Sequence, residues 1–316
     1  MQQKPEVLVV GAGAVGGFYG GKLAQAGARV SVVCRSDFDV VSSSGFTVES
    51  VLGDFQFMPE KVLRDAADYG PHADVVLVAT KVLPEVDVPR LIEGAVGPET
   101  AILLIQNGVE VEGPIAAAFP DNELLSGLAF IAVSRTGPGH IRHQDFGRLT
   151  IGRYPSGLSE RAELLAKLFE SSGLPCDLVE EVVTARWQKL VWNAPFNPMS
   201  VLGGGVDTQT LLESPESASL ILKVMEEVLN IASAVGHPLP PESIERNIEG
   251  TRALGSYKTS MLLDFEAGRP MEVEAILGNG VRAARRAGVP VPRMESLYAL
   301  IQLVDGKVRA RGSALP

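Results

Sequence analysis

Residues 7–17 read Val7-Leu8-Val9-Val10-Gly11-Ala12-Gly13-Ala14-Val15-Gly16-Gly17, an apolar run that ends in a glycine-rich turn. Gly11, Gly13 and Gly16 match the pattern G-x-G-x-x-G. In a strand–turn–helix unit the first glycine permits the tight turn and the second lets the backbone approach a pyrophosphate. The third lets the helix pack closely on the strand, and the helix N-terminus offers N–H groups and partial positive charge to phosphates.

The context of this motif is the one that a dinucleotide site requires. A helix with Val15, Phe18 and Leu23 on its inner face is expected after the turn, and Gly27 ends it before a second strand. A glycine-rich turn without a ligand is the alternative, but it does not explain why a strand precedes the turn and a helix follows it. We therefore predict that this loop binds a dinucleotide through Gly11, Ala12, Gly13, Ala14, Val15 and Gly16.

Further strands are expected at residues 30–34, 74–80 and 101–105, which are short, apolar and rich in β-branched residues. Helical stretches separate them, which indicates a parallel sheet buried on both faces. Residues 140–152 differ, because two short runs flank Gln-Asp-Phe-Gly. We expect these residues to form a hairpin that adds antiparallel strands to the sheet.

Helical periodicity dominates after about residue 180. Leucine, isoleucine and valine recur at three-to-four spacing in residues 218–235 and again in 272–287, where Gly288 and Pro290 give a stop signal. The predicted fold class is therefore α/β, with a doubly wound Rossmann sheet domain over residues 1–180. An all-helical domain is expected over residues 181–316.

The totals agree with a globular protein of two domains: 316 residues, 46% hydrophobic and 21% charged. A net charge of −10 without a block of like charge argues against nucleic acid or an anionic membrane as partner. Two cysteines and four histidines predict neither a disulfide framework nor a metal cluster. No signal-like segment and no apolar run of about 18 residues is present, so a cytoplasmic protein is expected.

The end of the second expected strand bears on the type of cofactor. In an NAD site an acidic residue here binds the ribose 2′-hydroxyl, whereas an arginine accommodates a 2′-phosphate. This strand ends in Cys34-Arg35-Ser36, and Lys81 follows a neighbouring strand at the same edge. Asp37 is a competing acidic group, and both cations could be ordinary surface charges. The sequence favours NADP(H) over NAD.

Polar residues in the second half suggest a site for a small molecule. Asn107 follows the strand at 101–105, where its amide can hold a carboxylate or simply form an Asn-Gly turn. Lys189, Asn193 and Asn197 are spaced by four and form one polar stripe on a helix. Buried amides need hydrogen-bond partners, which a bound ligand can provide. Pro195 is expected to kink this helix and so to change the direction of Asn197.

Each of these residues also has an ordinary explanation. Taken alone, Lys189 is a solvated lysine. Glu272 and Glu274 open a helix, where carboxylates complement the helix dipole. The run Met261-Leu262-Leu263 after Ser260 is typical of core.

Together these motifs resemble the ketopantoate reductase (2-dehydropantoate 2-reductase) family over nearly the whole chain. The resemblance rests on the glycine loop, Asn107-Gly108, Lys189 with Asn193 and Asn197, Ser260-Met261-Leu262-x-Asp264, and Glu272 twelve residues after Ser260. It implies a Rossmann domain and a helical domain like that of 6-phosphogluconate dehydrogenase, with the reaction in the cleft between them. It also implies an NADPH-dependent reduction of 2-dehydropantoate to (R)-pantoate, for pantothenate and coenzyme A synthesis.

The resemblance also implies roles for individual residues. Lys189 would be the general acid, Ser260 would bind the substrate carboxylate, and Asn193 and Asn197 would bind its oxygens. Asn107 would orient substrate and nicotinamide, and Glu272 would contact the ribose or Lys189. Arg35 and Lys81 would be the cations for the 2′-phosphate.

Two alternatives stay open beside this function: reduction of another branched 2-oxo acid, or NADP binding without turnover. Three positions depart from the family pattern, namely Glu110 after Asn107-Gly108-Val109, Asp207, and Arg293 after Pro290-Val291-Pro292. These departures bear on the substrate more than on the reaction class. Similar helical domains often dimerise, so a homodimer also stays open.

Overall fold

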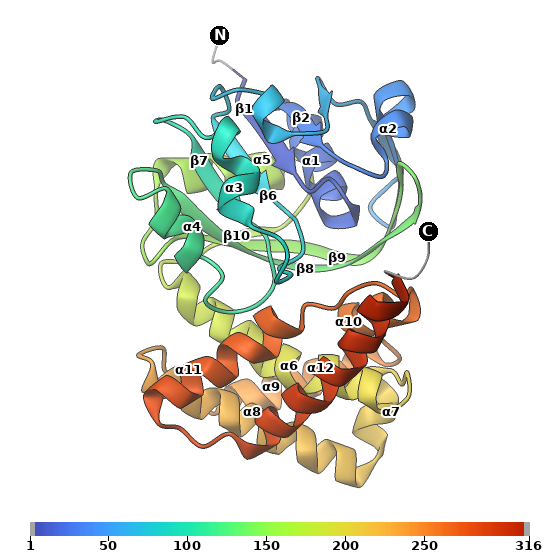
Figure 1. Cartoon of the computed structure of the whole chain (residues 1–316), viewed down its shortest axis with the longest axis vertical. Coiled ribbons are helices and arrows are strands. Elements are labelled where there is room, and N and C mark those ends of the chain that lie inside the picture. Colours follow the sequence, from blue (N-terminus) through green and yellow to red (C-terminus); the bar gives the residue numbers. More distant parts are fainter. Residues whose placement is uncertain (1–3, 313–316) are drawn as a thin grey trace. The chain divides into compact units, whose positions relative to one another are not determined.

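The computed structural model describes residues 4–312 and separates into two compact units (Figure 1). Unit 1 contains the described part of residues 1–81 together with 85–106 and 111–182. Unit 2 contains Val82–Pro84, Asn107–Glu110 and the described part of residues 183–316. Two short loops of the first half of the chain therefore belong to the helical unit.

Unit 1 is built on one sheet, in which the described residues form ten strands. Its parallel part follows the order β5 (Val62–Leu63), β2 (Arg29–Val33), β1 (Glu6–Val10), β6 (Val75–Val78), β7 (Ala101–Leu104) and β8 (Leu124–Gly137). The strand order reverses between β1 and β6, which is the switch point of a doubly wound sheet. The predicted Rossmann architecture is confirmed.

Each face of this sheet has its own core, because successive side chains of a strand point to opposite faces. Val7 and Val9 join the cluster that includes α1 (Ala14–Gln25) and α5 (Glu160–Ser171). Leu8 and Val10 join the cluster that includes α3 (Val88–Ile92) and α4 (Gly113–Ala118). Short helical turns at Ala66–Asp68 and Glu93–Ala95 extend this second face.

The predicted hairpin over residues 140–152 is wrong. These residues belong to one strand, β9 (His140–Arg153), which pairs antiparallel with β8. The pairing passes from Phe130↔Arg148 to Ile131↔Phe146, so Gly147 is an extra residue with a φ of 113°. Gln-Asp-Phe-Gly is therefore a bulge in a strand and not a turn between strands.

Three shorter strands complete the sheet next to β9 and beyond it. β3 (Phe46–Ser50) pairs parallel with β9, and β4 (Phe55–Phe57) pairs antiparallel with β3. β10 (Cys176–Leu178) pairs parallel with β9. Helix α2 (Phe38–Ser44) lies between β2 and β3 in the chain.

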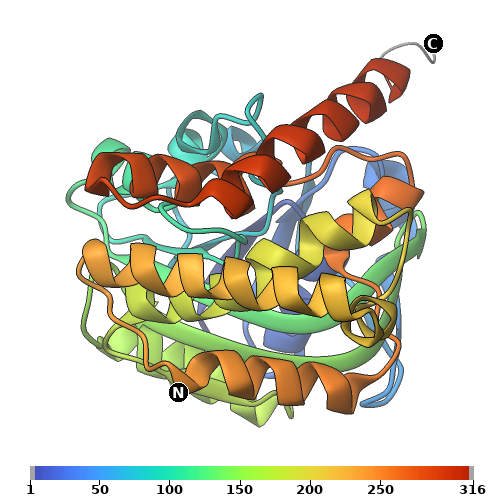
Figure 2. The same cartoon turned by 90° about the horizontal axis from the view of Figure 1, so that it is seen from below.

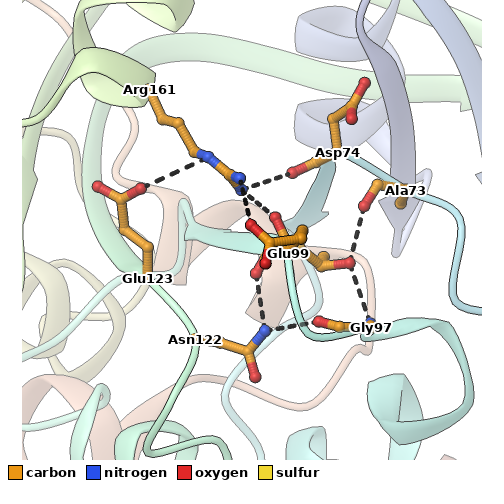
Figure 3. Close-up of polar contacts among 8 residues, drawn as sticks. Ala73, Asp74, Gly97, Glu99, Asn122, Glu123 and Arg161 are labelled. Atoms are coloured by element: carbon orange, nitrogen blue, oxygen red, sulfur yellow. Dashed lines mark hydrogen bonds and ion pairs between the residues drawn. The ribbon is translucent and has the colours of Figure 1, made fainter.

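A polar network holds the edge of the sheet at which β6, β7 and β8 begin (Figure 3). The Arg161 guanidinium donates to the Glu99 and Asp74 carbonyl oxygens, and it lies 3.8 Å from the Glu123 carboxylate. The Asn122 amide donates to the Gly97 and Thr100 carbonyl oxygens at 2.7 and 2.9 Å. These groups bind one another, so the polar residues at this edge stabilise the fold.

All of the regular secondary structure in the described part of unit 2 is helical, which confirms the predicted helical second domain. Its helices are α6 (Val182–Leu202, whose first residue belongs to unit 1), α7 (Thr208–Glu213), α8 (Pro215–Ala234), α9 (Glu242–Leu254), α10 (Ser260–Glu266), a π-helical turn at Glu274–Gly278, α11 (Asn279–Ala287) and α12 (Pro292–Gly312). α8 contacts α9, α11 and α12 (Figure 2), and side chains from most of these helices share one core. Within residues 4–312, no helix combines the length and the apolar character needed to cross a membrane.

Candidate functional site

Two positions of the glycine loop have no room for a side chain. Gly11 has a φ of 90°, and a Cβ there would lie 2.7 Å from Thr80. A Cβ on Gly16 would lie 2.4 Å from the Gly11 carbonyl oxygen. Both positions therefore require glycine.

Gly13 differs from these two glycines, because a Cβ there would meet nothing within 4 Å. It is exposed, and it precedes α1 as an N-cap without a side-chain hydrogen bond. There is therefore open space beside Gly13, and no side chain caps the start of α1. Phosphate oxygens fit this space and can accept hydrogen bonds from the backbone N–H groups at the start of α1. The loop therefore fits a dinucleotide.

Several cationic residues follow strand ends at the same edge of the sheet as this loop. Val10 is in register with Val33 of β2 and Val78 of β6, and Val33 is in register with Leu63 of β5. The chain therefore places Arg35, Arg64 and Lys81 just beyond neighbouring strand ends. Arg35 is exposed, whereas the Arg64 guanidinium lies 3.9 Å above the Phe38 ring and 3.1 Å from Asp39.

Asp37, the acidic residue that competes with Arg35 in the sequence, is buried in its own loop. Its carboxylate accepts hydrogen bonds from Arg135 at 2.6 Å, from Ser36 Oγ at 2.8 Å and from the Gly139 N–H at 3.1 Å. Only 3% of the residue is exposed. Asp37 therefore anchors the loop. No local motif marks its partner Arg135, which lies far away in the sequence on β8.

In unit 2, hydrogen bonds join three of the predicted residues. Lys189 Nζ on α6 donates to Asn107 Oδ1 at 2.8 Å. Asn107 Nδ2 donates to Glu272 Oε2 at 3.4 Å, and the backbone N–H of Val82 donates to Glu272 Oε1 at 3.0 Å. We call Lys189, Asn107 and Glu272 the lysine network; the amide oxygen faces the ammonium and the amide nitrogen faces the carboxylate.

The environment of Lys189 changes its acidity. Burial lowers the pKa of Lys189 to about 7, and the positive charge of Arg186 acts in the same direction. The negative charge of Glu272 opposes both effects. A lysine with this pKa can hold a proton and release it near neutral pH.

The loop that carries Asn107 is held on several sides. Gly108 has a φ of 103°, and a Cβ there would lie 2.4 Å from the Ala275 carbonyl oxygen, which also accepts the Val109 N–H at 3.3 Å. Arg186 Nη1 donates to the Gly108 carbonyl oxygen at 3.0 Å, and Asn279 Nδ2 donates to the Val109 carbonyl oxygen at 2.8 Å. Arg186 and Asn279 were not predicted, because no local motif marks a side chain that binds a distant backbone.

Asn193 and Asn197 lie one and two turns beyond Lys189 on α6, and both are buried. Within the described residues, neither Nδ2 nor Oδ1 of Asn197 has a hydrogen-bond partner. An unsatisfied buried amide costs about 1–3 kcal/mol. This side chain is therefore suited to a polar ligand that can both donate and accept.

Ser260 is the first residue of α10 and is exposed. Its neighbour Thr259 caps α10, and Thr259 Oγ1 lies 2.7 Å from Ser200 Oγ. Ser200 Oγ donates to the Asn197 carbonyl oxygen at 2.8 Å. The start of α10 is thus tied to the same part of α6 that carries Asn197.

The three departures from the family pattern each have a local structural partner. Glu110 has a φ of 55° and forms an ion pair with Arg286. Asp207 caps α7 by accepting the Thr210 N–H at 2.8 Å, and it also accepts the Ser256 hydroxyl, a bond that lowers the pKa of Asp207. The Arg293 guanidinium lies 3.1 Å from the buried carboxylate of Glu227, which also accepts two backbone N–H groups at the start of α12.

Comparisons with known proteins agree with these motifs. The chain matches the models Ketopantoate reductase PanE/ApbA over residues 7–156 and Ketopantoate reductase PanE/ApbA C terminal over residues 181–305. It is 35% identical over 306 residues to a 2-dehydropantoate 2-reductase of Nostoc sp., covering 95% of each chain.

Solved structures show the same fold. A crystal structure of 2-dehydropantoate 2-reductase from Methylococcus capsulatus is 50% identical with a TM-score of 0.90, covering 96% of this chain and 97% of that one. A ternary structure of D-mandelate dehydrogenase with NADH and anilino(oxo)acetate is 20% identical with a TM-score of 0.87, covering 96% and 99%. The second likeness concerns the fold alone. The chain belongs to the ketopantoate reductase family of pyridine-nucleotide-dependent oxidoreductases.

Proposed function

We propose that the protein reduces 2-dehydropantoate to (R)-pantoate with NADPH, a step of pantothenate and coenzyme A synthesis. The lysine network carries this proposal, because it holds a proton donor with a pKa of about 7 in a fixed position. The substrate named for the relatives from Nostoc sp. and Methylococcus capsulatus supports the choice of 2-oxo acid. A cytoplasmic location and a homodimer remain predictions.

The chemistry needs a donor of this kind. Bound NADPH would supply the hydride to the ketone carbon. Negative charge then develops on the ketone oxygen, and the Lys189 ammonium stabilises it and donates the proton. Asn107 fixes the direction of the ammonium through its 2.8 Å hydrogen bond, and Glu272 holds the Asn107 amide.

The remaining residues would hold the substrate. Asn197 offers a buried donor and acceptor that have no partner among residues 4–312, which suits a hydroxyl group. Asn193 would bind a second oxygen, and the Ser260 hydroxyl would bind the carboxylate. We also propose that Asn107 orients the nicotinamide and that Glu272 contacts the cofactor ribose.

NADP(H) is the proposed cofactor because of the charges at the edge of the sheet. Arg35 is exposed there, and Lys81 follows the adjacent β6. Asp37, which would repel a 2′-phosphate if it were free, is neutralised by Arg135 at 2.6 Å. These three features favour a phosphate on the ribose over a free 2′-hydroxyl.

The substrate is tested by following NADPH oxidation with 2-dehydropantoate and with 3,3-dimethyl-2-oxobutanoate, which lacks only the 4-hydroxyl group. A site that hydrogen-bonds the hydroxyl should prefer 2-dehydropantoate in kcat/KM by about a hundredfold or more. Better turnover of another 2-oxo acid would replace the substrate and keep the reaction class. NADPH binding without turnover of any 2-oxo acid would favour the non-catalytic alternative.

A further inference from the structure

Arg186 is a buried cation beside the lysine network. It lies on α6 one turn before Lys189, and only 3% of the residue is exposed. A buried guanidinium loses much of its hydration, so its protein partners largely determine where it can lie. One of them is the Gly108 carbonyl oxygen, 3.0 Å from Arg186 Nη1.

This carbonyl belongs to the residue next to Asn107. The Gly108 backbone also packs closely against Ala275, where no side chain would fit. Arg186 therefore holds the Gly108 carbonyl while Ala275 limits the space around its Cα. Because Asn107 is the adjacent residue, a fixed Gly108 backbone also fixes the position of the Asn107 side chain, which accepts from Lys189 Nζ at 2.8 Å.

We propose that Arg186 is a positioning residue for Lys189: its hydrogen bond to Gly108 fixes the Asn107 amide, and its charge acts on the ammonium that this amide receives. The inference rests on the proposed role of Lys189 as proton donor. It assigns two effects to one side chain. The hydrogen bond sets the position of the donor, and the positive charge sets how readily the donor loses its proton.

The charges around Lys189 allow these effects to be separated. Burial and Arg186 lower the pKa of Lys189, and Glu272 raises it. Removal of the Arg186 charge should therefore raise this pKa. Loss of the hydrogen bond alone should lower the rate without moving the pKa, because a misplaced donor is less effective at every pH.

Three variants divide the two effects. Arg186→Gln removes the charge and keeps an N–H donor, Arg186→Lys keeps the charge with a shorter reach, and Arg186→Met removes both. We expect the alkaline limb of the kcat–pH profile to move up by about one pH unit in the Gln and Met variants. It should stay in place in Arg186→Lys, and kcat below the limb should fall by about 10- to 100-fold in Arg186→Met and less in the other two.

Arg286→Gln is the matched control. Arg286 also pairs with the Asn107–Glu110 loop, through Glu110, but its side chain is 59% exposed. This variant should leave both the limb and kcat unchanged. Circular dichroism and thermal unfolding identify variants that do not fold, and the Gln and Lys variants then decide the question without Arg186→Met.

A second measurement does not depend on turnover. In protein labelled with nitrogen-15 lysine, the Lys189 Nζ resonance is the one missing from Lys189→Ala, and its titration gives the lysine pKa directly. If the Lys189 pKa rises in Arg186→Gln but the unsubstituted protein turns over no 2-oxo acid, the charge effect of Arg186 is retained and the proposed reaction is rejected. An unchanged pKa and unchanged kcat in folded Arg186→Gln and Arg186→Met would overturn the role of Arg186.

Discussion

The sheet edge of unit 1 that carries the glycine loop and Arg35, where we propose that the cofactor binds, holds its polar groups in the opposite way from the lysine network of unit 2. We call this sheet edge the cofactor edge. At the cofactor edge Arg35 and Gly13 are exposed, and a Cβ on Gly13 would meet nothing within 4 Å. In the lysine network Lys189, Asn107 and Glu272 are joined in a chain of hydrogen bonds. An open edge is suited to binding a charged ligand, whereas a bonded network is suited to fixing the position and acidity of one group.

This contrast separates the expected effects of substitutions. Changes at the cofactor edge should alter KM and the preference between NADPH and NADH. Changes at Lys189 and Asn107 should alter kcat and its dependence on pH, whereas a change at Glu272, which we propose contacts the cofactor ribose, should also alter KM for the cofactor. Exceptions to this division would show that one of the two regions has been assigned the wrong role.

The largest effect is expected from Lys189→Ala. Without the donor, kcat should fall by about 10²–10⁴, the usual contribution of a positioned general acid. NADPH affinity, measured by fluorescence titration, should change much less, because the glycine loop belongs to the other unit. A near-normal kcat would mean that another group donates the proton.

A smaller loss is expected from Asn107→Ala, which removes the acceptor of the Lys189 ammonium. Misplacement of the donor should lower kcat by about 10- to 100-fold. Asn122→Ala is the matched control, because its amide binds the Gly97 and Thr100 carbonyl oxygens in unit 1 (Figure 3). It should lower the thermal midpoint and leave kcat near normal, and equal kcat losses in both variants would point to a general effect of instability.

Arg35→Ala should act at the cofactor edge alone. Loss of one cation for the 2′-phosphate should raise KM for NADPH by about tenfold, the effect of about 1.4 kcal/mol, with little change for NADH. Arg161→Ala removes an arginine from the opposite edge and should leave both KM values unchanged (Figure 3). Equal increases for the two cofactors in Arg35→Ala would contradict the NADP assignment.

The smallest effect is expected from Arg293→Ala, at a position that departs from the family pattern. Arg293 pairs with Glu227, which keeps two backbone donors after the substitution. The free energy of unfolding should fall by about 1 kcal/mol, with kcat and KM unchanged. A change in KM for the 2-oxo acid would connect Arg293 to the substrate.

The sequence predicted the parts that local patterns encode. Buried parallel strands are continuous apolar runs, so β1 and β7 were found close to their observed bounds. The glycine loop was found because the spacing of Gly11, Gly13 and Gly16 after an apolar strand is a local signal, and Gly11 and Gly16 have no room for a side chain. The hairpin at residues 140–152 failed because Gly147 serves equally well in a bulge and in a turn.

The missed residues share a different property. Arg186, Asn279 and Arg135 act on groups far away in the sequence, namely the Gly108 and Val109 carbonyl oxygens and the Asp37 carboxylate. No spacing rule connects such partners, because the fold brings them together. The resemblance to a family was therefore needed to select Lys189 from the other lysines, and the structure was needed to find what holds it.

The rate of hydride transfer in a single turnover, measured against pH, tests the central claim most directly. The Lys189 donor must carry its proton to act, and its pKa is about 7. The rate should therefore be constant below about pH 7 and fall about tenfold per pH unit above it. A rate that stays constant up to about pH 9, or an alkaline limb that persists in Lys189→Ala, would contradict the assignment of Lys189 as the proton donor.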